Sequence, residues 1–435
     1  MSSNETNKAI KNSIWVIGSK VINIVIGFAA SVLITRYLGA EQKGIMADSS
    51  AISTMTGFLA GFGLMDIMIS RFSSDYENSG KTAASGMLLM FLGGVVAFAI
   101  SLMIAIGLGH SREVIIYVFI CALTHIWHFF DVYEYWFYSR NNSKYYAAAQ
   151  SIMHIVFLGL RIIGVPLKAP LVYFILMIIL EDGAVKLSAR LSYKKAKDPF
   201  VGKFQVDKDI IKDLVRLALP MILSGFASTI YLKIDQVMIG KLIGHVELGI
   251  YNVGVTLAEY WIFIPVALYN SFLPLLTGSA SDENVLYKKL QKFADMMVGI
   301  AYLAVLGVMI FGRWGVTLLY GQEFSSAATV LMIYIWSGIF TCLNFVATAI
   351  YVINKDTKIV FAINITGAAI NFVLNIIMIN LYGSIGAAFA TLLEYIIVFL
   401  GQMVILRKRY GKLYVVQLKA FFPFIRLLKN LKERS

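Results

Sequence analysis

The feature that most constrains this chain is a succession of twelve apolar runs separated by mostly short polar breaks. A helix needs about 20 predominantly apolar residues to cross the hydrocarbon core of a bilayer, and each run is of about that length. A backbone exposed to lipid must satisfy its own hydrogen bonds, so the runs are predicted to be helices. The predicted spans are residues 14–35, 46–70, 86–108, 114–138, 146–166, 169–189, 214–240, 248–277, 294–319, 327–353, 359–381 and 385–406.

The composition agrees with an all-α integral membrane protein. The 435 residues are 59% hydrophobic and only 14% charged, with a mean hydropathy of +0.75, which excludes an ordinary soluble domain. The first run is too long for the apolar region of a cleaved signal peptide, so we expect it to be retained. Cys121 and Cys342 lie alone in apolar segments and are predicted to be small buried residues. No metal or cofactor is predicted.

The basic residues set the predicted orientation. A net charge of +13 is typical of nucleic-acid binding too, but here the basic residues fall between the apolar runs and after the last one. If the N-terminus and alternate breaks share one face, that face has 27 of the 38 Lys and Arg residues, and the other face has five, Lys43 among them. The positive-inside rule then places both termini in the cytoplasm of a multi-pass cell-membrane protein that binds no nucleic acid.

The longest internal break, 191–209, divides the chain into two sets of six spans. The predicted domains are an N-terminal lobe at 1–190, a cytoplasmic linker at 191–209, a C-terminal lobe at 210–406 and a basic tail at 407–435. The tail is either an amphipathic helix on the inner leaflet or a solvated topology anchor. The apolar residues of its proposed face are Phe421, Phe422, Phe424, Ile425, Leu427 and Leu428.

The two sets of spans are related by an internal repeat. A shift of 205 residues places Lys11 on Arg216, Arg36 on Lys241, Leu38-Gly39 on Ile243-Gly244, and Gly44 on Gly249. A shift over an even number of spans keeps their orientation, so the halves are predicted to be parallel repeats. Transporters of this design bind substrate between the halves and alternate its access to the two sides.

Several motifs carry a resemblance to a known family. They are Ile10-Lys11-Asn12-Ser13 with Trp15, TRYLGAEQKG at 35–44, GFGLMD at 61–66 with Arg71, IDQVMIG at 234–240, LGIYN at 248–252 and YGSIGAAFAT at 382–391. In this order and spacing, they resemble the polysaccharide repeat-unit flippases that serve O-antigen and capsule synthesis. Those proteins belong to the multidrug/oligosaccharidyl-lipid/polysaccharide (MOP) exporter superfamily.

The resemblance implies a fold, a function and partners. The expected architecture is twelve transmembrane helices in two six-helix parallel repeats, forming a V-shaped, alternating-access transporter. The expected function is flipping an undecaprenyl-pyrophosphate-linked oligosaccharide from the inner to the outer leaflet for O-antigen, capsule or exopolysaccharide synthesis. The expected partners are that lipid-linked oligosaccharide, the bilayer and a polysaccharide polymerase.

Cations within the spans are the predicted substrate-binding residues. A pyrophosphate cannot enter hydrocarbon unaided, because removing charge from water costs many kcal/mol. Lys233, deep in the run from Arg216 to Lys241, is the first candidate, and Arg161 is the second. Arg36 and Arg313 complete the set, although both are also interpretable as residues near span ends that reach the interface.

Acidic residues and histidines are the predicted ion-coupling residues. Asp235 lies some 200° around the helix from Lys233, so the two are not expected to pair with each other. Asp235 either forms an interhelical ion pair or titrates as part of ion coupling. Asp48 and Glu259 are added to the predicted relay.

The fourth span has His125, His128, Asp131 and Glu134 at steps of three. Such steps drift about 60° each, so His125 and Glu134 are expected on opposite faces, and a metal site is disfavoured. A proton relay or a hydrogen-bond site for sugar is predicted instead, because histidine titrates near neutral pH. The alternative for Glu134 is an interfacial residue.

Other functions are weighed against these patterns. The chain has no phosphate-binding loop for ATP, so transport is expected to run on an ion or substrate gradient. A membrane-embedded polymerase or glycosyltransferase needs a catalytic region, which the short outward breaks do not offer, so no catalytic residues are predicted. The remaining alternative is a drug/cation antiporter or another lipid-linked precursor flippase of the same superfamily.

Overall fold

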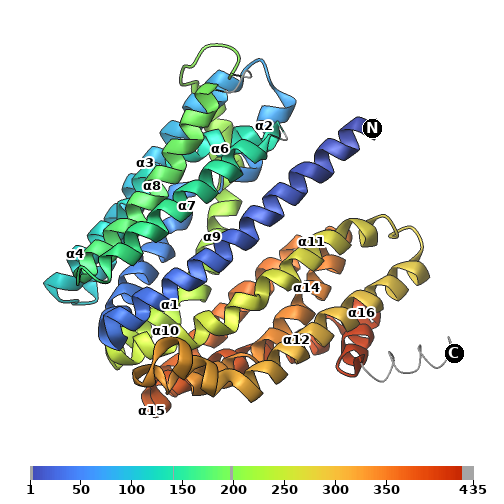
Figure 1. Ribbon diagram of the computed structural model, residues 1–435. Coiled ribbons are helices and arrows are strands. Elements are labelled where there is room, and N and C mark those ends of the chain that lie inside the picture. Colours follow the sequence, from blue (N-terminus) through green and yellow to red (C-terminus); the bar gives the residue numbers. More distant parts are fainter. Residues whose placement is uncertain (1–2, 141, 196–198, 424–435) are drawn as a thin grey trace. The chain divides into compact units, whose positions relative to one another are not determined.

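The computed structural model describes residues 3–140, 142–195 and 199–423, and every regular element in these ranges is helical. This confirms the predicted fold class. The helices are α1 (Ser3–Gly61), α2 (Met65–Ser74), α3 (Ser79–Gly107), α4 (Arg112–Ala122), α5 (Thr124–Trp127), η1 (His128–Phe130), α6 (Asp131–Ser139), α7 (Ser143–Gly164), α8 (Leu171–Lys195), α9 (Lys208–Leu242), α10 (His245–Glu259), η2 (Tyr260–Ile262), α11 (Phe263–Thr277), α12 (Glu283–Tyr320), η3 (Gln322–Phe324), α13 (Ala327–Tyr334), α14 (Ser337–Ile353), α15 (Thr357–Ile405) and α16 (Arg407–Ala420) (Figure 1).

Eight helical stretches of the described chain are long and apolar enough to cross a membrane. Two of them contain a non-helical glycine, Gly39 in α1 and Gly383 in α15, so each consists of two helices that meet at a kink. Helices α8 and α9 lie at the two other predicted spans, residues 169–189 and 214–240. Together these helices account for the twelve predicted spans.

The break predicted between the first two spans is much shorter than expected. The sequence predicted a polar connection over residues 36–45, with Lys43 in it. Instead, the helix is interrupted at Gly39, whose φ of 75° and ψ of 177° suit a residue without a Cβ, and helical structure then continues. Lys43 therefore lies within a helix, with only 9% of its surface exposed. Its assignment to an outer loop was wrong, because one glycine replaces the loop.

Local geometry repeats with the predicted shift of 205 residues. Gly244, the counterpart of Gly39, has φ 100° and ψ 174° and separates α9 from α10. The fourth span is interrupted around residues 123–130, and the tenth span is interrupted at 335–336. The repeat read from the motifs is thus also present in the places where the helices break.

The chain divides into two compact units, Met1–Val237 and Met238–Ser435. The first unit comprises α1 to α8 and most of α9, and the second comprises the remaining helices. The sequence-based boundary at residues 191–209 stays a prediction.

The described part of the linker is fixed to the first unit by hydrogen bonds to the start of α3. The Gly80 N–H donates to the Val201 carbonyl (2.8 Å), and the Val201 N–H donates to Ser79 Oγ (2.8 Å). Further along, the Asp207 N–H donates to Ser85 Oγ (3.0 Å). The described part of the linker, residues 199–207, is therefore an ordered strap.

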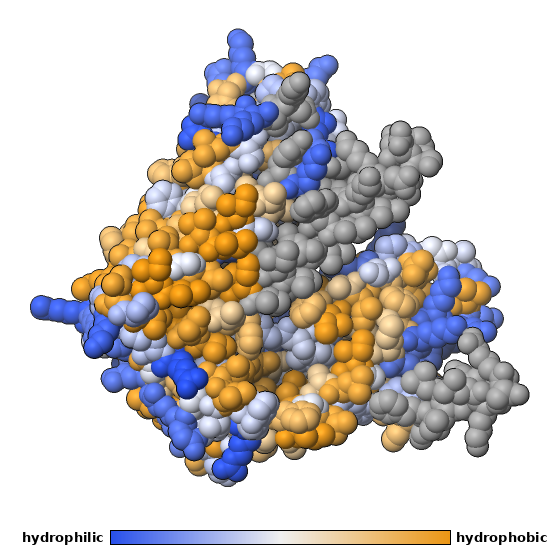
Figure 2. Space-filling model, viewed as in Figure 1, coloured by the Kyte–Doolittle hydropathy of each residue, from blue (hydrophilic) through white to orange (hydrophobic). Residues whose placement is uncertain are grey.

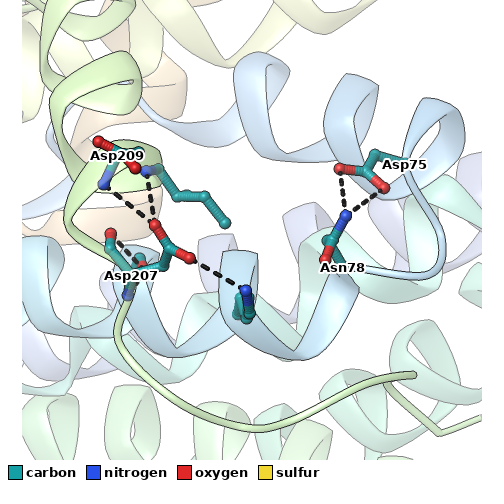
Figure 3. A network of polar contacts seen from close by, with 7 residues as sticks. Asp75, Asn78, Asp207 and Asp209 are labelled. Atoms are coloured by element: carbon teal, nitrogen blue, oxygen red, sulfur yellow. Dashed lines mark hydrogen bonds and ion pairs between the residues drawn. The ribbon is translucent and has the colours of Figure 1, made fainter.

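Asp207 is the last residue of this strap and directly precedes α9, which begins at Lys208 (Figure 3). Its Oδ1 accepts the backbone N–H groups of Asp209 (3.0 Å) and Ile210 (3.3 Å), so it caps the helix. Its Oδ2 lies 3.1 Å from Lys81 Nζ. The bond from Lys81 is the main reason that the pKa of Asp207 lies below its usual value.

The surface carries large apolar side chains along the helices. On α12, Leu303, Leu306, Ile310 and Phe311 are exposed. In Figure 2, hydrophobic residues cover the sides of the first unit's helices, and hydrophilic residues gather at the helix ends. This is the distribution that a lipid environment requires, because hydrocarbon surrounds only the middle of each helix.

Candidate functional site

The interrupted fourth span brings His125 into the interior of the first unit. Helix α4 ends at Ala122, and short helices follow until α6 begins at Asp131. His125 is only 3% exposed, and its Nε2 lies 3.2 Å from Ser53 Oγ and 3.1 Å from Thr56 Oγ1. Thr56 in turn contacts Ser101 of α3 (2.6 Å). A titratable ring thus contacts two hydroxyl groups of α1, and one of these is linked to a hydroxyl group of α3.

A second group of side chains lies one turn further along. His128 Nδ1 is 2.6 Å from Asp131 Oδ2, and the two imidazole rings of His125 and His128 stack with centroids 6.2 Å apart. Lys186 of α8 approaches Asp131 Oδ1 at 3.7 Å and Asp182 at 3.2 Å. The spacing of three residues does bring His128 and Asp131 together. Lys186 is a further partner of Asp131 that the spacing did not indicate.

Glu181 holds two basic side chains of α7. It accepts a hydrogen bond from Arg161 and contacts His154, and all three residues are mostly buried. Arg161 was predicted to bind substrate. The structure gives it an acidic partner within its own unit, which is what a structural ion pair needs.

The other predicted acids of the first unit occupy separate positions. Asp48 is fully buried, and its Oδ2 lies 3.6 Å from His110 Nδ1. Glu134 of α6 is near Asp131 and is hydrogen-bonded by the hydroxyl groups of Tyr138 and Tyr146.

Helix α9 buries the two members of its charged pair to different degrees. Asp235 is buried, whereas Lys233 is half-buried. The charge of Lys233 acts on the buried ammonium of Lys43, so two cations share one neighbourhood of the first unit. Lys43 was missed as a candidate because the sequence placed it in a loop. The sequence signal that could have identified it is the position of Lys43 only four residues after Gly39.

The remaining predicted residues are more exposed. Arg36 is exposed in α1, and Arg313 is exposed in α12 of the second unit. Glu259 is also exposed, at the end of α10, and accepts a hydrogen bond from the Tyr334 hydroxyl (3.0 Å). Arg313 and Glu259 belong to the second unit, whereas the cluster around His125 belongs to the first.

Helix α15 contains a buried polar group that charge-based reasoning missed. Asn375 donates to Asn371 Oδ1 (2.8 Å), and Asn371 is 3.4 Å from Thr391 Oγ1. Glu394 is buried on the same helix. Uncharged amides four residues apart in an apolar run were the sequence signal, because such a spacing puts them on one face.

Two family models match the chain. Residues 9–276 match the model described as polysaccharide biosynthesis protein, and residues 187–427 match the model of the lipid II flippase MurJ.

Two curated proteins are similar in sequence. The chain is 26% identical over 273 residues to an uncharacterized membrane protein of Methanocaldococcus jannaschii, covering 60% of this chain and 62% of the other. It is also 26% identical over 249 residues to the lipid II flippase MurJ of Bacillus subtilis, covering 53% of this chain and 43% of the other. The match therefore spans less than two thirds of either relative.

Solved structures show the fold of this chain. The lipid II flippase MurJ in an inward closed conformation matches with a TM-score of 0.71 at 16% identity, covering 97% of this chain and 93% of that one. An inward-facing MATE family multidrug transporter of the MOP superfamily matches with a TM-score of 0.71 at 14% identity, covering 92% of this chain and 99% of that one. Flippases and exporters of small molecules share this fold.

Proposed function

We propose that this chain flips a lipid-linked oligosaccharide across the cell membrane. The chain belongs to the polysaccharide biosynthesis protein family, whose model matches residues 9–276. The substrate class is an isoprenoid pyrophosphate carrying a sugar repeat unit for O-antigen, capsule or exopolysaccharide synthesis. A polymerase that consumes the flipped unit is the proposed partner. The similarity to MurJ supports the movement of a lipid-linked precursor.

The observation that carries this proposal is the presence of Lys233 and Lys43 together in a membrane-spanning unit. An ionisable residue within a membrane is costly, by at least about 2.5 kcal/mol, so two neighbouring cations require a compensating role. An anionic pyrophosphate is a chemical complement to both ammonium groups. Asp235, on the buried side of α9, is proposed to take part in ion coupling instead.

The cluster of His125, His128 and Asp131 is proposed to couple flipping to an ion gradient. His125 contacts hydroxyl groups, while His128 contacts a carboxylate that also faces Lys186. Moving a proton onto either ring changes the charge balance of this buried group, which is the requirement for coupling. Asp48, Glu134 and Glu259 remain candidates for the same role at other positions, and Arg161, Arg36 and Arg313 remain secondary candidates for binding substrate.

The test measures surface polysaccharide and the leaflet location of lipid-linked intermediates in cells that lack this chain. We expect intermediates to accumulate on the inner leaflet and surface polymer to be lost. Unchanged polymer with new drug sensitivity would instead favour a drug or cation antiporter.

The variant that tests the site is Lys233→Ala, with Lys241→Ala as its matched control. Both lysines belong to α9, but Lys241 is exposed. Lys233→Ala is expected to abolish export while the protein stays in the membrane at normal abundance, and Lys241→Ala is expected to export normally. Normal polymer in the Lys233→Ala strain would contradict the proposed role.

A further inference from the structure

Helix α16 follows the last membrane span directly and is attached to the second unit by one of its faces. Tyr410 contacts Asp356, and the Tyr414 hydroxyl lies 3.1 Å from that of Tyr351. Gln417 donates to the Leu343 carbonyl (2.9 Å). These contacts hold α16 against α14, and Gln291 of α12 donates a hydrogen bond to the Val416 carbonyl of α16 (3.3 Å) (Figure 1).

The opposite face of α16 is exposed and has a distinct composition. Its middle is apolar, with Val415, Leu418 and Phe422, and Phe422 is 64% exposed. At 100° per residue, Val415 and Leu418 lie 60° apart around the helix, and Lys412 and Lys419 lie along one margin of this arc. Phe422 follows two residues after the helix ends at Ala420. We call these five residues the α16 outer face.

All the charged side chains of α16 are basic. Lys412 forms an ion pair with Glu283 at the start of α12 (2.8 Å), and Arg409 forms one with Asp356 (2.6 Å). Besides Lys412 and Lys419, the helix begins with Arg407, Lys408 and Arg409, and its sequence contains no acidic residue, so basic charge is in excess. An apolar centre with lysines at its edge is the pattern of helices that lie in the membrane interface. The apolar side chains enter the acyl boundary there, and the ammonium groups reach lipid phosphates.

We propose that the α16 outer face binds the anionic phospholipids of the leaflet next to the C-terminus. Charge complementarity selects this occupant over a zwitterionic lipid. The position of α16 directly after a membrane span puts its outer face within reach of that leaflet. Of the six residues predicted to form the apolar face, Phe422 belongs to the α16 outer face, Phe421 is less exposed, and those from Phe424 onward lie outside the described residues. The proposal is independent of the transported substrate.

The experiment uses the full chain in vesicles of phosphatidylcholine alone or with phosphatidylglycerol. A cysteine replaces Leu418 and carries an environment-sensitive fluorophore, and Cys121 and Cys342 are both buried. Nitroxide-labelled phosphatidylglycerol or phosphatidylcholine then serves as the quencher. A label at Ser281, in the exposed turn before α12, provides the reference for an aqueous position.

We expect strong quenching at position 418, weak quenching at 281, and a severalfold preference for the anionic quencher at 418. The double variant K412Q/K419Q is expected to bring that preference close to one, since each basic residue near an anionic surface favours binding by about fivefold. The matched control K292Q/K358Q removes the same charge from exposed positions outside α16 and is expected to keep the preference.

Three results would overturn the proposal. The first is quenching at 418 no stronger than at 281. The second is equal quenching by the two lipids in the native chain. The third is a fluorescence change that follows the protein-to-lipid ratio instead of lipid composition, which would identify a second copy of the chain as the occupant.

Discussion

At the scale of single residues, the buried ion pair between Lys186 and Asp131 offers a direct measurement. Asp131 faces His128 at 2.6 Å and Lys186 at 3.7 Å, and its side chain is mostly inaccessible. Removing one partner of a buried pair leaves the other charge uncompensated, whereas replacing both can be nearly neutral. The contribution of each partner is therefore separable.

Lys186→Ala is expected to destabilise the detergent-solubilised protein by about 3 kcal/mol, measured by thermal unfolding. The double variant Asp131→Asn with Lys186→Met is expected to recover much of that loss. Lys194→Ala, at an exposed position near the end of the same helix, serves as control and is expected to change stability by less than about 0.5 kcal/mol. Equal losses at positions 186 and 194 would show that the pair does not stabilise the fold.

The sequence allowed some residue contacts to be predicted but not others. The contact of His128 with Asp131 follows from their spacing, because a step of three is local. The ion pair of Arg161 with Glu181 joins two helices, and the sequence alone does not say which faces meet. Lys43 was misplaced for a different reason: a single glycine conformation decided whether its segment was loop or helix.

At the scale of elements, the glycines at 39 and 244 interrupt helices with extended ψ and positive φ. This region of backbone conformation is almost confined to glycine, and other residues in it cost about 1–3 kcal/mol. A Cβ at Gly244 would meet no atom within 4 Å, so its substitution tests the backbone alone.

Gly244→Ala is expected to lower the unfolding free energy by about 1–3 kcal/mol, as followed by thermal unfolding. The control is Gly299→Ala, in α12 of the same unit, where a Cβ also meets no atom within 4 Å and the backbone is helical. That change is expected to be neutral or stabilising by up to about 1 kcal/mol. A harmless Gly244→Ala substitution would contradict the strain argument.

The linker strap makes a prediction about pH. Lys81 holds the pKa of Asp207 below its usual value, so the folded strap favours the ionised carboxylate. That stabilisation is fully present above the unfolded pKa of about 3.9 and is lost as the pH falls through the lower folded pKa. Amide hydrogen exchange at residues 199–207, corrected for intrinsic rates, is therefore expected to speed up in acid.

Two variants separate the ion pair from the helix cap. Asp207→Asn keeps a capping side chain but loses the attraction to Lys81, so faster exchange is expected already at neutral pH. Asp209→Asn removes a neighbouring carboxylate in the first turn of α9 and is expected to leave exchange in the strap unchanged. Identical exchange in the native chain and in Asp207→Asn would rule out a role for this ion pair.

At the scale of the whole molecule, the sequence was most informative. Apolar run length predicted the helices, and lipid leaves the backbone few alternatives, so the class of fold followed from composition and spacing. The interruptions within the fourth and tenth spans did not follow, because no glycine or proline lies at residues 123–130 or 335–336 to indicate a break. The orientation rests on the distribution of lysine and arginine.

Thiol labelling in intact cells tests that orientation. A cysteine at Leu167, an exposed residue between α7 and α8, is expected to react with a membrane-impermeant maleimide from outside. A cysteine at Lys203, exposed in the linker, is expected to react only after permeabilisation. The native cysteines are buried, so the unmodified chain provides the background. The reverse pattern would invert the topology.

The matched interruptions at Gly39 and Gly244 also place events in order. If both halves descend from one duplicated six-helix ancestor, then the glycine break was already present before the duplication, together with the interruptions shared by the fourth and tenth spans. Pro220, within α9, has Trp15 as its counterpart at the same shift. That proline thus marks a difference acquired after the copies began to diverge. Under such a duplication, the shared breaks are older than the divergence of the halves, and unshared residues such as Pro220 reflect changes that came after it.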